Sequence, residues 1–340
     1  MTSSGGGQLA IGIGRRHFIS GLGGAAVTWP LAAQAQQSVL PVIGWLNSGS
    51  AHDPLFAGFL TAYRAGLKDA GYVEDQNVEI DLLWGEGQYA RLPALAAELV
   101  GKRVAVIAAG GPPAALAAKA ATETIPIVFT VGDDPVKLGL VASLNRPGGN
   151  ATGINLIDNE LEAKRLGLLR EAVPAANTIA VLLNPKNPSV DTQSKDLQAG
   201  ARASGLEIVI LMAASQQDID QAFTTIGQMQ AGALLVGSDP FLIAFREQLV
   251  TFAARQSLPT MFAFRAAAEI GGLMSYGISF AEAYREAGVY AGRILKGEKP
   301  SELPVVRPTK FDLIINLKTA RTLGLTLSPG LLSIADEVIE

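Results

Sequence analysis

The sequence predicts an α/β fold built from two similar, doubly wound, Rossmann-like lobes. From residue 41 onward, short apolar runs of strand length alternate with longer stretches of helical period. The short runs are continuously apolar, which is typical of parallel strands covered by helices on both faces. The whole pattern occurs a second time after Gly153, so the chain carries two copies of one βαβαβαβ unit.

Each copy is expected to contribute four strands and three helices. In the first copy the strands are expected at residues 42–46, 78–83, 104–108 and 127–130, with helices at 54–70, 88–101 and 112–122. In the second copy the strands are expected at 178–183, 207–212, 233–236 and 260–263, with helices at 189–204, 217–230 and 240–256. The two copies match in detail, because Asn47 and Asn184 both end the first strand, and Pro126 and Pro259 both precede the last.

The segment after Gly271 is too short to form a third domain. It predicts strands at 273–276 and 311–315 and helices at 280–295, 317–323 and 329–337. We expect these elements to complete both lobes, with crossovers near 150–155, 274–279 and 304–310. The predicted first lobe therefore comprises residues 38–153 with 277–304, and the second lobe residues 154–276 with 305–340.

Residues 1–35 read as an export signal. Arg15-Arg16 is followed by an apolar, small-residue run and by the A-x-A site Ala33-Gln34-Ala35. The paired arginines resemble a twin-arginine signal. The alternative is a membrane anchor, but the run is too short and too rich in glycine to cross about 30 Å of hydrocarbon comfortably. We expect cleavage near Ala35 and a periplasmic protein.

Composition excludes several functions. The chain has 340 residues, with 27 Lys+Arg against 31 Asp+Glu and no basic cluster, which argues against nucleic acid as a partner. It has no cysteine and only 2 histidines, so thiol chemistry and transition-metal ligation are not expected. The sequence also has no G-x-S-x-G and no phosphate-binding loop motif. We therefore predict no catalytic residue, no metal and no cofactor.

Ligands of open parallel sheets bind beyond the carboxyl ends of the strands. The residues that follow the expected strands are the candidate ligand-binding residues. They are Asn47, Ser48, Ser50, Gly110, Gly111, Thr130, Asp133 and Asp134 from the first lobe, and Asn184, Ser238, Asp239, Phe264, Arg265 and Tyr276 from the second lobe and its crossover.

Several candidates also have a purely structural interpretation. Asp134 and Asp239 each precede a proline, as a helix N-cap would. The serines at 48 and 50 fit a turn, and Tyr276 fits a packed aromatic. The Gly110-Gly111 pair fits a tight turn, or a turn that lets a ligand reach backbone N–H groups.

Ordered stretches along the chain resemble a known family. They are Gly110-Gly111-Pro112-Pro113, Ile125-Pro126-Ile127-Val128-Phe129, Asp134-Pro135-Val136, the run at 145–153, the run at 292–300, Asn316-Leu317-Lys318 and Ala335-Asp336-Glu337. The family comprises solute-binding proteins of ABC transporters whose better-studied members take up tryptophan and related aromatic amino acids. The resemblance implies a type I periplasmic-binding fold, a small-molecule ligand, an ABC permease as partner and a monomer.

One departure from the family bears on the cleft. Many members read Gly-Thr-Asp-Pro where this chain has Gly132-Asp133-Asp134-Pro135, which adds a carboxylate. Arg265 follows a strand of the other lobe. The acid and the cation could hold a zwitterion between them, or could pair directly with each other.

The favoured function is an exported protein that traps a small molecule, such as an amino acid, between two lobes for an ABC permease. In this hypothesis Asp239 accepts the ligand's ammonium group, and N–H groups around Ser48 and Gly110 bind its carboxylate. A periplasmic sensor for a receptor kinase would have the same sequence features. An enzyme on this scaffold would have to use the Asp133 and Asp134 pair, and a repressor domain is excluded by the export signal.

Overall fold

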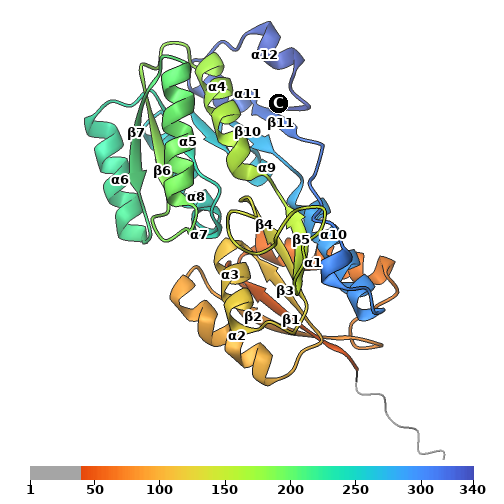
Figure 1. Cartoon of the computed structure of the whole chain (residues 1–340). Coiled ribbons are helices and arrows are strands. Elements are labelled where there is room, and N and C mark those ends of the chain that lie inside the picture. The colour runs from red at the N-terminus through yellow and green to blue at the C-terminus, as the bar shows by residue number, and fades with distance from the viewer. Residues whose placement is uncertain (1–39) are drawn as a thin grey trace, which may run out of the picture. The chain divides into compact units, whose positions relative to one another are not determined.

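The computed structural model describes residues 40–340, and the predicted export signal lies outside these described residues. The described chain contains two sheets with helices packed on their faces (Figure 1). We call each sheet with its helices a lobe. Among residues 40–340, no helix is both long enough and apolar enough to cross a membrane.

The first lobe is built on a parallel sheet with the strand order β2-β1-β3-β4-β5. Its strands are β1 (Val42–Asn47), β2 (Glu79–Trp84), β3 (Val106–Gly110), β4 (Ile127–Val131) and β5 (Ala151–Asn155). Its helices are α1 (Pro54–Asp69), η1 (Tyr89–Arg91), α2 (Leu92–Gly101), α3 (Pro112–Ala121), α10 (Phe280–Leu295) and η3 (Pro300–Glu302).

The helices α1 and α10 pack against each other although they are far apart in the sequence (Figure 1). Glycines make this contact close. A Cβ on Gly66 would lie 1.8 Å from the Arg285 carbonyl oxygen, and one on Gly288 would lie 2.1 Å from the Tyr63 carbonyl oxygen. The contact thus fixes α10 to the first lobe.

The second lobe is built on a sheet with the order β12-β11-β10-β9-β8-β6-β7, in which β10 and β11 pair antiparallel and the other pairs are parallel. Its strands are β6 (Thr178–Leu183), β7 (Glu207–Met212), β8 (Ala233–Val236), β9 (Thr260–Phe262), β10 (Met274–Gly277), β11 (Asp312–Asn316) and β12 (Glu337–Ile339). Its helices are η2 (Asp158–Leu161), α4 (Glu162–Ala172), α5 (Val190–Ala203), α6 (Gln216–Gln228), α7 (Pro240–Ala244), α8 (Arg246–Arg255), α9 (Arg265–Glu269), α11 (Leu317–Thr322) and α12 (Pro329–Ser333).

The chain passes between the lobes three times, after β5, after β10 and before β11. Near the first and third passages the two segments touch, because Ile154 forms a β-bridge with Val306. The α/β class and the two doubly wound lobes that the sequence predicts are confirmed.

Four local predictions were wrong. The helix expected at 240–256 is interrupted at Phe245, and the helix expected at 329–337 ends at Ser333, after which β12 forms. The segment expected only as a crossover at 150–155 contains β5, and α4 was not predicted. In β5 the apolar pattern is broken by Gly153, whose φ is +155° and whose Cβ would lie 2.0 Å from the Phe129 carbonyl oxygen. In α4 the charged residues Glu162 and Arg165 are fully buried. The buried face of this helix is therefore not uniformly apolar, and the sequence does not show the usual helical spacing of apolar residues.

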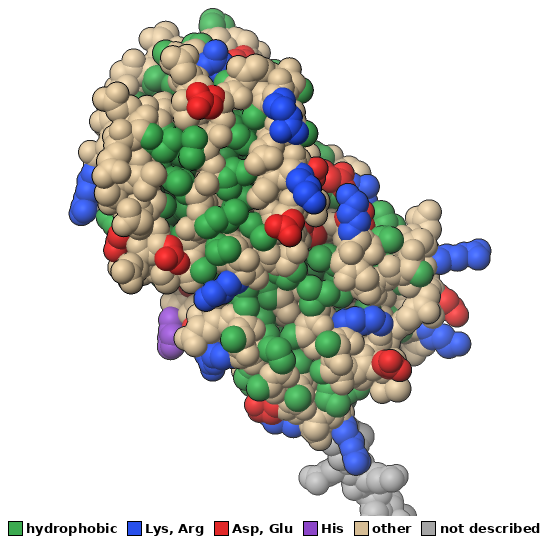
Figure 2. Space-filling view, turned by 60° about the vertical axis from the view of Figure 1, so that its left-hand side comes forward, with side chains coloured by type: hydrophobic (Ala, Val, Ile, Leu, Met, Phe, Trp, Pro, Cys, Tyr) green, Lys and Arg blue, Asp and Glu red, His purple; other side chains and the backbone are tan. Residues whose placement is uncertain are grey.

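On the face drawn in Figure 2, acidic and basic side chains are interspersed, and no broad basic area is visible. This agrees with the nearly balanced charge of the sequence, a formal net charge of −4. Such a face is unlike the clustered basic surface with which proteins bind nucleic acid.

Candidate ligand-binding site

A small cavity of about 40 Å³ lies between the two lobes, at the carboxyl ends of their strands. Both lobes contribute to its wall. It is lined by Asn47, Phe56, Phe59, Gly110, Gly111, Pro112, Thr130, Gly132, Asp133, Leu156, Asp158, Ser238, Pro240, Ile243, Phe280 and Tyr284. The mixture of apolar surface with a few polar groups is typical of a small-molecule site.

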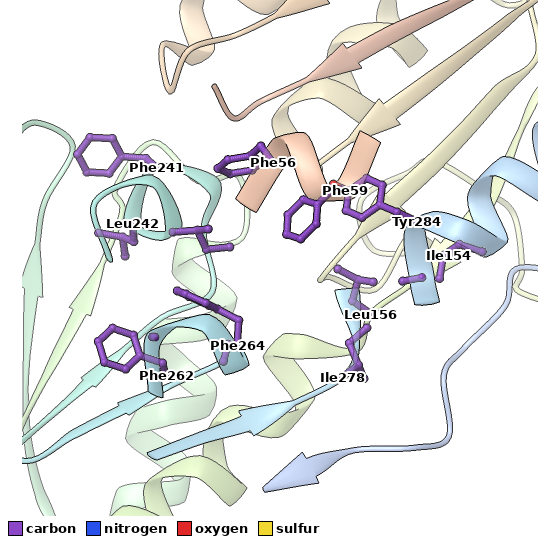
Figure 3. Close-up of a cluster of buried hydrophobic side chains, with 14 of the residues drawn as sticks. Phe56, Phe59, Ile154, Leu156, Phe241, Leu242, Phe262, Phe264, Ile278 and Tyr284 are labelled. Atoms are coloured by element: carbon purple, nitrogen blue, oxygen red, sulfur yellow. The ribbon is translucent and has the colours of Figure 1, made fainter. Parts of the chain in front are cut away.

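One wall of the cavity is aromatic. The Phe59 and Tyr284 rings are stacked with centroids 4.7 Å apart, and the Phe59 and Phe280 rings with centroids 5.4 Å apart. Phe56 meets Phe59 edge-on at 5.4 Å. Figure 3 shows Phe56, Phe59 and Tyr284 on the first-lobe side, and Phe241 and Phe264 on the second-lobe side. The α1 and α10 contact positions this wall, because Phe59 belongs to α1 and Phe280 and Tyr284 to α10.

Asp158 places a buried carboxylate at the cavity. Its Oδ1 accepts a hydrogen bond from the Arg165 guanidinium at 3.0 Å, and its Oδ2 accepts one from the Ser238 hydroxyl at 2.9 Å. Arg165 also donates to the Asp158 carbonyl oxygen and, at 2.6 Å, to the Tyr276 carbonyl oxygen at the end of β10. Burial raises the pKa of Asp158, while Arg165 and the Ser238 hydroxyl lower it. A neighbouring cation would favour the charged form further.

Glu162 lies behind Asp158 and is fully buried. Its Oε1 accepts a hydrogen bond from the Gln193 side-chain amide at 3.3 Å, and no described residue donates to its Oε2. Burial raises the pKa of Glu162 to about 8. Arg165 lowers this pKa, while Asp158 and the first lobe's Asp133 raise it. Asp133 and Asp158 therefore place two carboxylates at this end of the cavity, while Glu162, which does not line it, is largely protonated near neutral pH. Among residues 40–340, no group of three or more acidic or histidine side chains is arranged to hold a metal ion.

The Gly110-Gly111 turn brings the backbone close to other groups, as one interpretation predicted. A Cβ on Gly110 would lie 2.2 Å from the Asn47 side-chain nitrogen, and one on Gly111, whose φ is +91°, would lie 3.1 Å from Pro240 of the second lobe. The turn does not offer N–H groups to a carboxylate. The Gly111 N–H bonds the Thr130 carbonyl oxygen, and the residues that begin α3 are Pro112 and Pro113, which have no N–H.

Ser48 was also predicted to help bind the ligand's carboxylate, but its N–H group and hydroxyl already have hydrogen-bond partners within the first lobe. The Ser48 hydroxyl oxygen accepts the Ala114 N–H of α3 at 3.2 Å, and the Ser48 N–H donates to the Gly110 carbonyl oxygen at 3.0 Å. Ser48 is buried and does not line the cavity. Its side chain therefore caps α3, which corrects the expected role.

Asp239 is the N-cap of α7, as its structural interpretation predicted, and does not have the ligand-binding role that the favoured hypothesis gave it. Its carboxylate accepts hydrogen bonds from five donors, which are the side chains of Asn184, Asn187 and Tyr89 and the N–H groups of Phe241 and Leu242. These donors occupy both oxygens, and Asp239 does not line the cavity, although Ser238 and Pro240 on either side of it do. The arrangement leaves no position for a ligand's ammonium group at this carboxylate.

The structure brings six of the candidate residues to the cavity and leaves eight outside it. The six are Asn47, Gly110, Gly111, Thr130, Asp133 and Ser238. Of the others in the first lobe, Ser50 lies in a groove at the mouth of the cleft, and Asp134 caps a single turn by accepting the N–H groups of Val136 and Lys137. In the second lobe, Asn184 supports Asp239.

The expected pairing of Arg265 with an acid of the first lobe is wrong. The Arg265 guanidinium bonds Glu269 and Glu337 of its own lobe, each at 2.6 Å. Arg265 and Phe264 line a neighbouring cavity between α1, α9 and β10, which shares the Phe59 and Phe280 side chains with the first cavity. Tyr276 packs against Phe311, with ring centroids 6.1 Å apart, which fits the structural interpretation of this residue.

The sequence analysis missed the aromatic wall and Asp158. Phe56 and Phe59 were read only as part of a helix, as were Phe280 and Tyr284. A signal was present, because Asp53-Pro54 and Ser279 mark helix N-termini directly after strands, and helices that begin there present their first turns to the cleft. Asp158 follows a strand, β5, that the sequence did not reveal.

Two sheets whose strand ends meet at one cavity, joined by three passages of the chain, define a two-lobed ligand-binding protein of the type I periplasmic-binding fold. The family model for ABC transporter substrate binding proteins matches residues 48–339, and the chain belongs to this family. A curated tyrosine-binding protein from Clostridioides difficile is 28% identical over 269 residues, which cover 79% of this chain and 76% of that protein.

Two solved structures differ in how well they match. A domain from Streptococcus pneumoniae in complex with L-tryptophan has a TM-score of 0.80 at 26% identity, covering 88% of this chain and 100% of that one. A ligand-free, open substrate-binding protein from Clostridium difficile has a TM-score of 0.62 at 25% identity, covering 88% and 99%. At nearly equal identity, the lobes described here resemble the ligand-bound arrangement more than the open one.

Proposed function

We propose that this protein binds an aromatic amino acid between its lobes and delivers it to an ABC permease. The single observation that carries the proposal is the cavity with an aromatic wall at one side and the carboxylates Asp133 and Asp158 at the other. The tyrosine-binding relative and the tryptophan-bound neighbour support the same ligand class.

The acidic end favours an amine. Asp133 belongs to the first lobe and Asp158 bonds to Arg165 and Ser238 of the second, so an ammonium group placed between them contacts both lobes. The one guanidinium nearby, that of Arg165, already bonds Asp158 and the Tyr276 carbonyl oxygen. A ligand that carried only a carboxylate would add negative charge to a desolvated acidic site, which is unfavourable.

The opposite polar end suits a carboxylate. Asn47 at the end of β1 and Thr130 near the end of β4 both line the cavity, with β3 between these two strands, and the Asn47 side-chain nitrogen lies 3.4 Å from the Tyr284 hydroxyl. Burial raises the pKa of Tyr284 to about 12, so this hydroxyl keeps its proton and can donate it. We assign these three side chains to the ligand's carboxylate and the stacked rings of Phe59 and Phe280 to its aromatic side chain.

The proposal extends to location and assembly. We propose export with cleavage near Ala35, a periplasmic site of action, a monomer and no catalytic role. The bodies that close on the ligand are the predicted lobes, residues 38–153 with 277–304 and residues 154–276 with 305–340, except that β5 (Ala151–Asn155) belongs as a whole to the first lobe and β10 (Met274–Gly277) to the second. Membership in the ABC transporter substrate-binding family supports export and a role in binding rather than catalysis.

Calorimetric titration of the chain from residue 36 tests the proposal. L-tryptophan and L-tyrosine should bind, whereas the deaminated indole-3-propionate should not. Asp158→Asn should weaken binding well over tenfold, since a lost charged partner in a desolvated site costs roughly 2–5 kcal/mol. Asp134→Asn is the matched control and should bind like the unaltered protein. Equal affinity for tryptophan and its deaminated analogue would refute the assignment of the acidic end.

A further inference from the structure

Outside the ligand cavity, side chains of the two lobes bond directly to each other. The Tyr89 hydroxyl of the first lobe donates to Asp239 Oδ2 at 2.8 Å and accepts the Phe241 N–H at 3.1 Å. The Arg246 guanidinium of α8 donates to Asp53 Oδ2 of the first lobe at 2.5 Å. Tyr89, Asp53 and Arg246 line the groove at the mouth of the cleft, and none of them lines the cavity.

These contacts are shielded from water. Asp239 is 2% exposed, and the side chains of Asp53 and Arg246 are 11% and 8% exposed. Burial, with the Asp239 charge close by, raises the pKa of Tyr89 well above its ordinary value, so its hydroxyl remains a donor. Charge-assisted hydrogen bonds that are largely removed from solvent are stronger than exposed ones.

Each partner is held in position by its own lobe. Within the second lobe Asp239 is fixed by Asn184, by Asn187 and by the first N–H groups of α7, and Arg246 also donates to the Ile243 carbonyl oxygen at 3.1 Å. Within the first lobe Asp53 caps α1 by accepting the Leu55 N–H at 2.9 Å. Groups that are already oriented lose little conformational entropy when they pair.

We propose that Tyr89 and the Asp53–Arg246 pair form a latch that sets ligand affinity and residence time without touching the ligand. The proposal rests on the proposed function, because it assumes that binding and closure go together. The apparent affinity of a protein that binds in its closed form scales with the fraction that is closed. Contacts made only on closure therefore tighten binding, and they act mainly by slowing dissociation.

The first test is kinetic, with L-tryptophan and L-tyrosine as probes in stopped-flow fluorescence. Tyr89→Phe should raise the dissociation rate about tenfold and leave the association rate almost unchanged. Asp53→Asn should do the same, because asparagine still caps α1 but no longer carries the charge. Folding should survive in both variants, since the Phe241 N–H keeps its bond to Asp239 Oδ1 at 2.9 Å.

Tyr290→Phe is the matched control. Its hydroxyl donates to the Pro304 carbonyl oxygen at 2.8 Å, and Tyr290 lines neither the groove nor the cavity. It should lower the melting temperature slightly and leave the dissociation rate unchanged. A dissociation rate in Tyr89→Phe and Asp53→Asn equal to that of the unaltered protein would overturn the latch, as would an equal increase in Tyr290→Phe.

A second measurement needs no ligand. The chain has no cysteine, so spin labels at Ala94→Cys on α2 and Gln217→Cys on α6 are unique, and both sites are exposed. One label lies on each lobe, on α2 of the first and on α6 of the second (Figure 1). The ligand-free distance distribution should shift to longer distances in the Tyr89→Phe, Asp53→Asn double variant. An unchanged distribution would overturn the latch, whereas failure of both amino acids to bind the unaltered protein would overturn only the proposed ligand.

Discussion

Asp134-Pro135 and Asp239-Pro240 are the same two-residue motif, placed after a strand in each lobe, but their carboxylates have different surroundings. Asp134 is partly exposed and accepts only the N–H groups of Val136 and Lys137. Asp239 is 2% exposed and accepts five hydrogen bonds, one of them from the opposite lobe. The comparison teaches that burial and partners, rather than the capping motif, decide which aspartate couples the lobes.

Replacing the buried carboxylate should have the largest effect. Asp239→Ala leaves the amides of Asn184 and Asn187, the Tyr89 hydroxyl and two N–H groups without their acceptor. We expect a loss of roughly 3 kcal/mol in the free energy of unfolding, because unsatisfied buried groups are costly. Urea denaturation followed by circular dichroism measures it. A loss below 1 kcal/mol would mean that Asp239 is no more than a cap.

Glu162 extends the comparison of carboxylates, because it is buried like Asp239 but accepts fewer hydrogen bonds. Its ordinary pKa is 4.5 and its pKa in the folded protein is about 8, so the unfolded chain loses this proton first. The free energy of unfolding should therefore fall as pH rises from about 4.5 to 8. Glu162→Gln removes this dependence, so the stability of the variant relative to the unaltered protein should rise by roughly 3 kcal/mol over this range.

Denaturation at pH 5 and pH 8 checks this sign. The same pair of measurements on Asp134→Asn serves as the control and should show no such change in relative stability. A Glu162→Gln variant whose relative stability stays constant between the two pH values would show that Glu162 ionises normally in the folded protein.

Replacing the exposed carboxylate should have the smallest effect. Asp134→Ala loses a cap on a single turn, which costs about 1 kcal/mol or less in the free energy of unfolding. Ligand affinity should be unchanged, because Asp134 does not line the cavity. Thermal denaturation and calorimetric titration of the same sample measure both quantities. A tenfold loss of ligand affinity in Asp134→Ala would contradict the claim that this exposed aspartate serves only as a cap.

The lobes could be predicted from the sequence because strands such as β3, β4 and β8 are almost entirely apolar, and helices such as α1, α3 and α7 begin at a proline. The strand bounds at Thr178–Leu183, Glu207–Met212 and Ala233–Val236 agree with the prediction. The strand β5 and the helix α4 could not be predicted, because Gly153 interrupts one pattern and buried Glu162 and Arg165 disguise the other. Asp158 lies between these two elements, so it was missed with them.

The roles of the candidate residues were harder to predict than their positions. The rule that ligands bind at the carboxyl ends of parallel strands correctly predicted that four polar or charged side chains line the cavity, those of Asn47, Thr130, Asp133 and Ser238. Three of the five donors to Asp239, the side chains of Asn184, Asn187 and Tyr89, come from segments more than 50 residues away. Whether a polar side chain already has hydrogen-bond partners within the protein depends on this tertiary structure. A local sequence pattern does not contain that information.

A crystal structure of the protein with L-tryptophan or L-tyrosine tests the central claim most directly. We expect the ligand's ammonium nitrogen within about 3 Å of an Asp158 carboxylate oxygen, with Asp133 on its other side and the ring against Phe59 and Phe280. In the same structure Asp239 should keep its bonds to Tyr89 and Asn184. An ammonium group bonded to Asp239, or a ligand seated in the neighbouring cavity beside Phe264, would contradict the account.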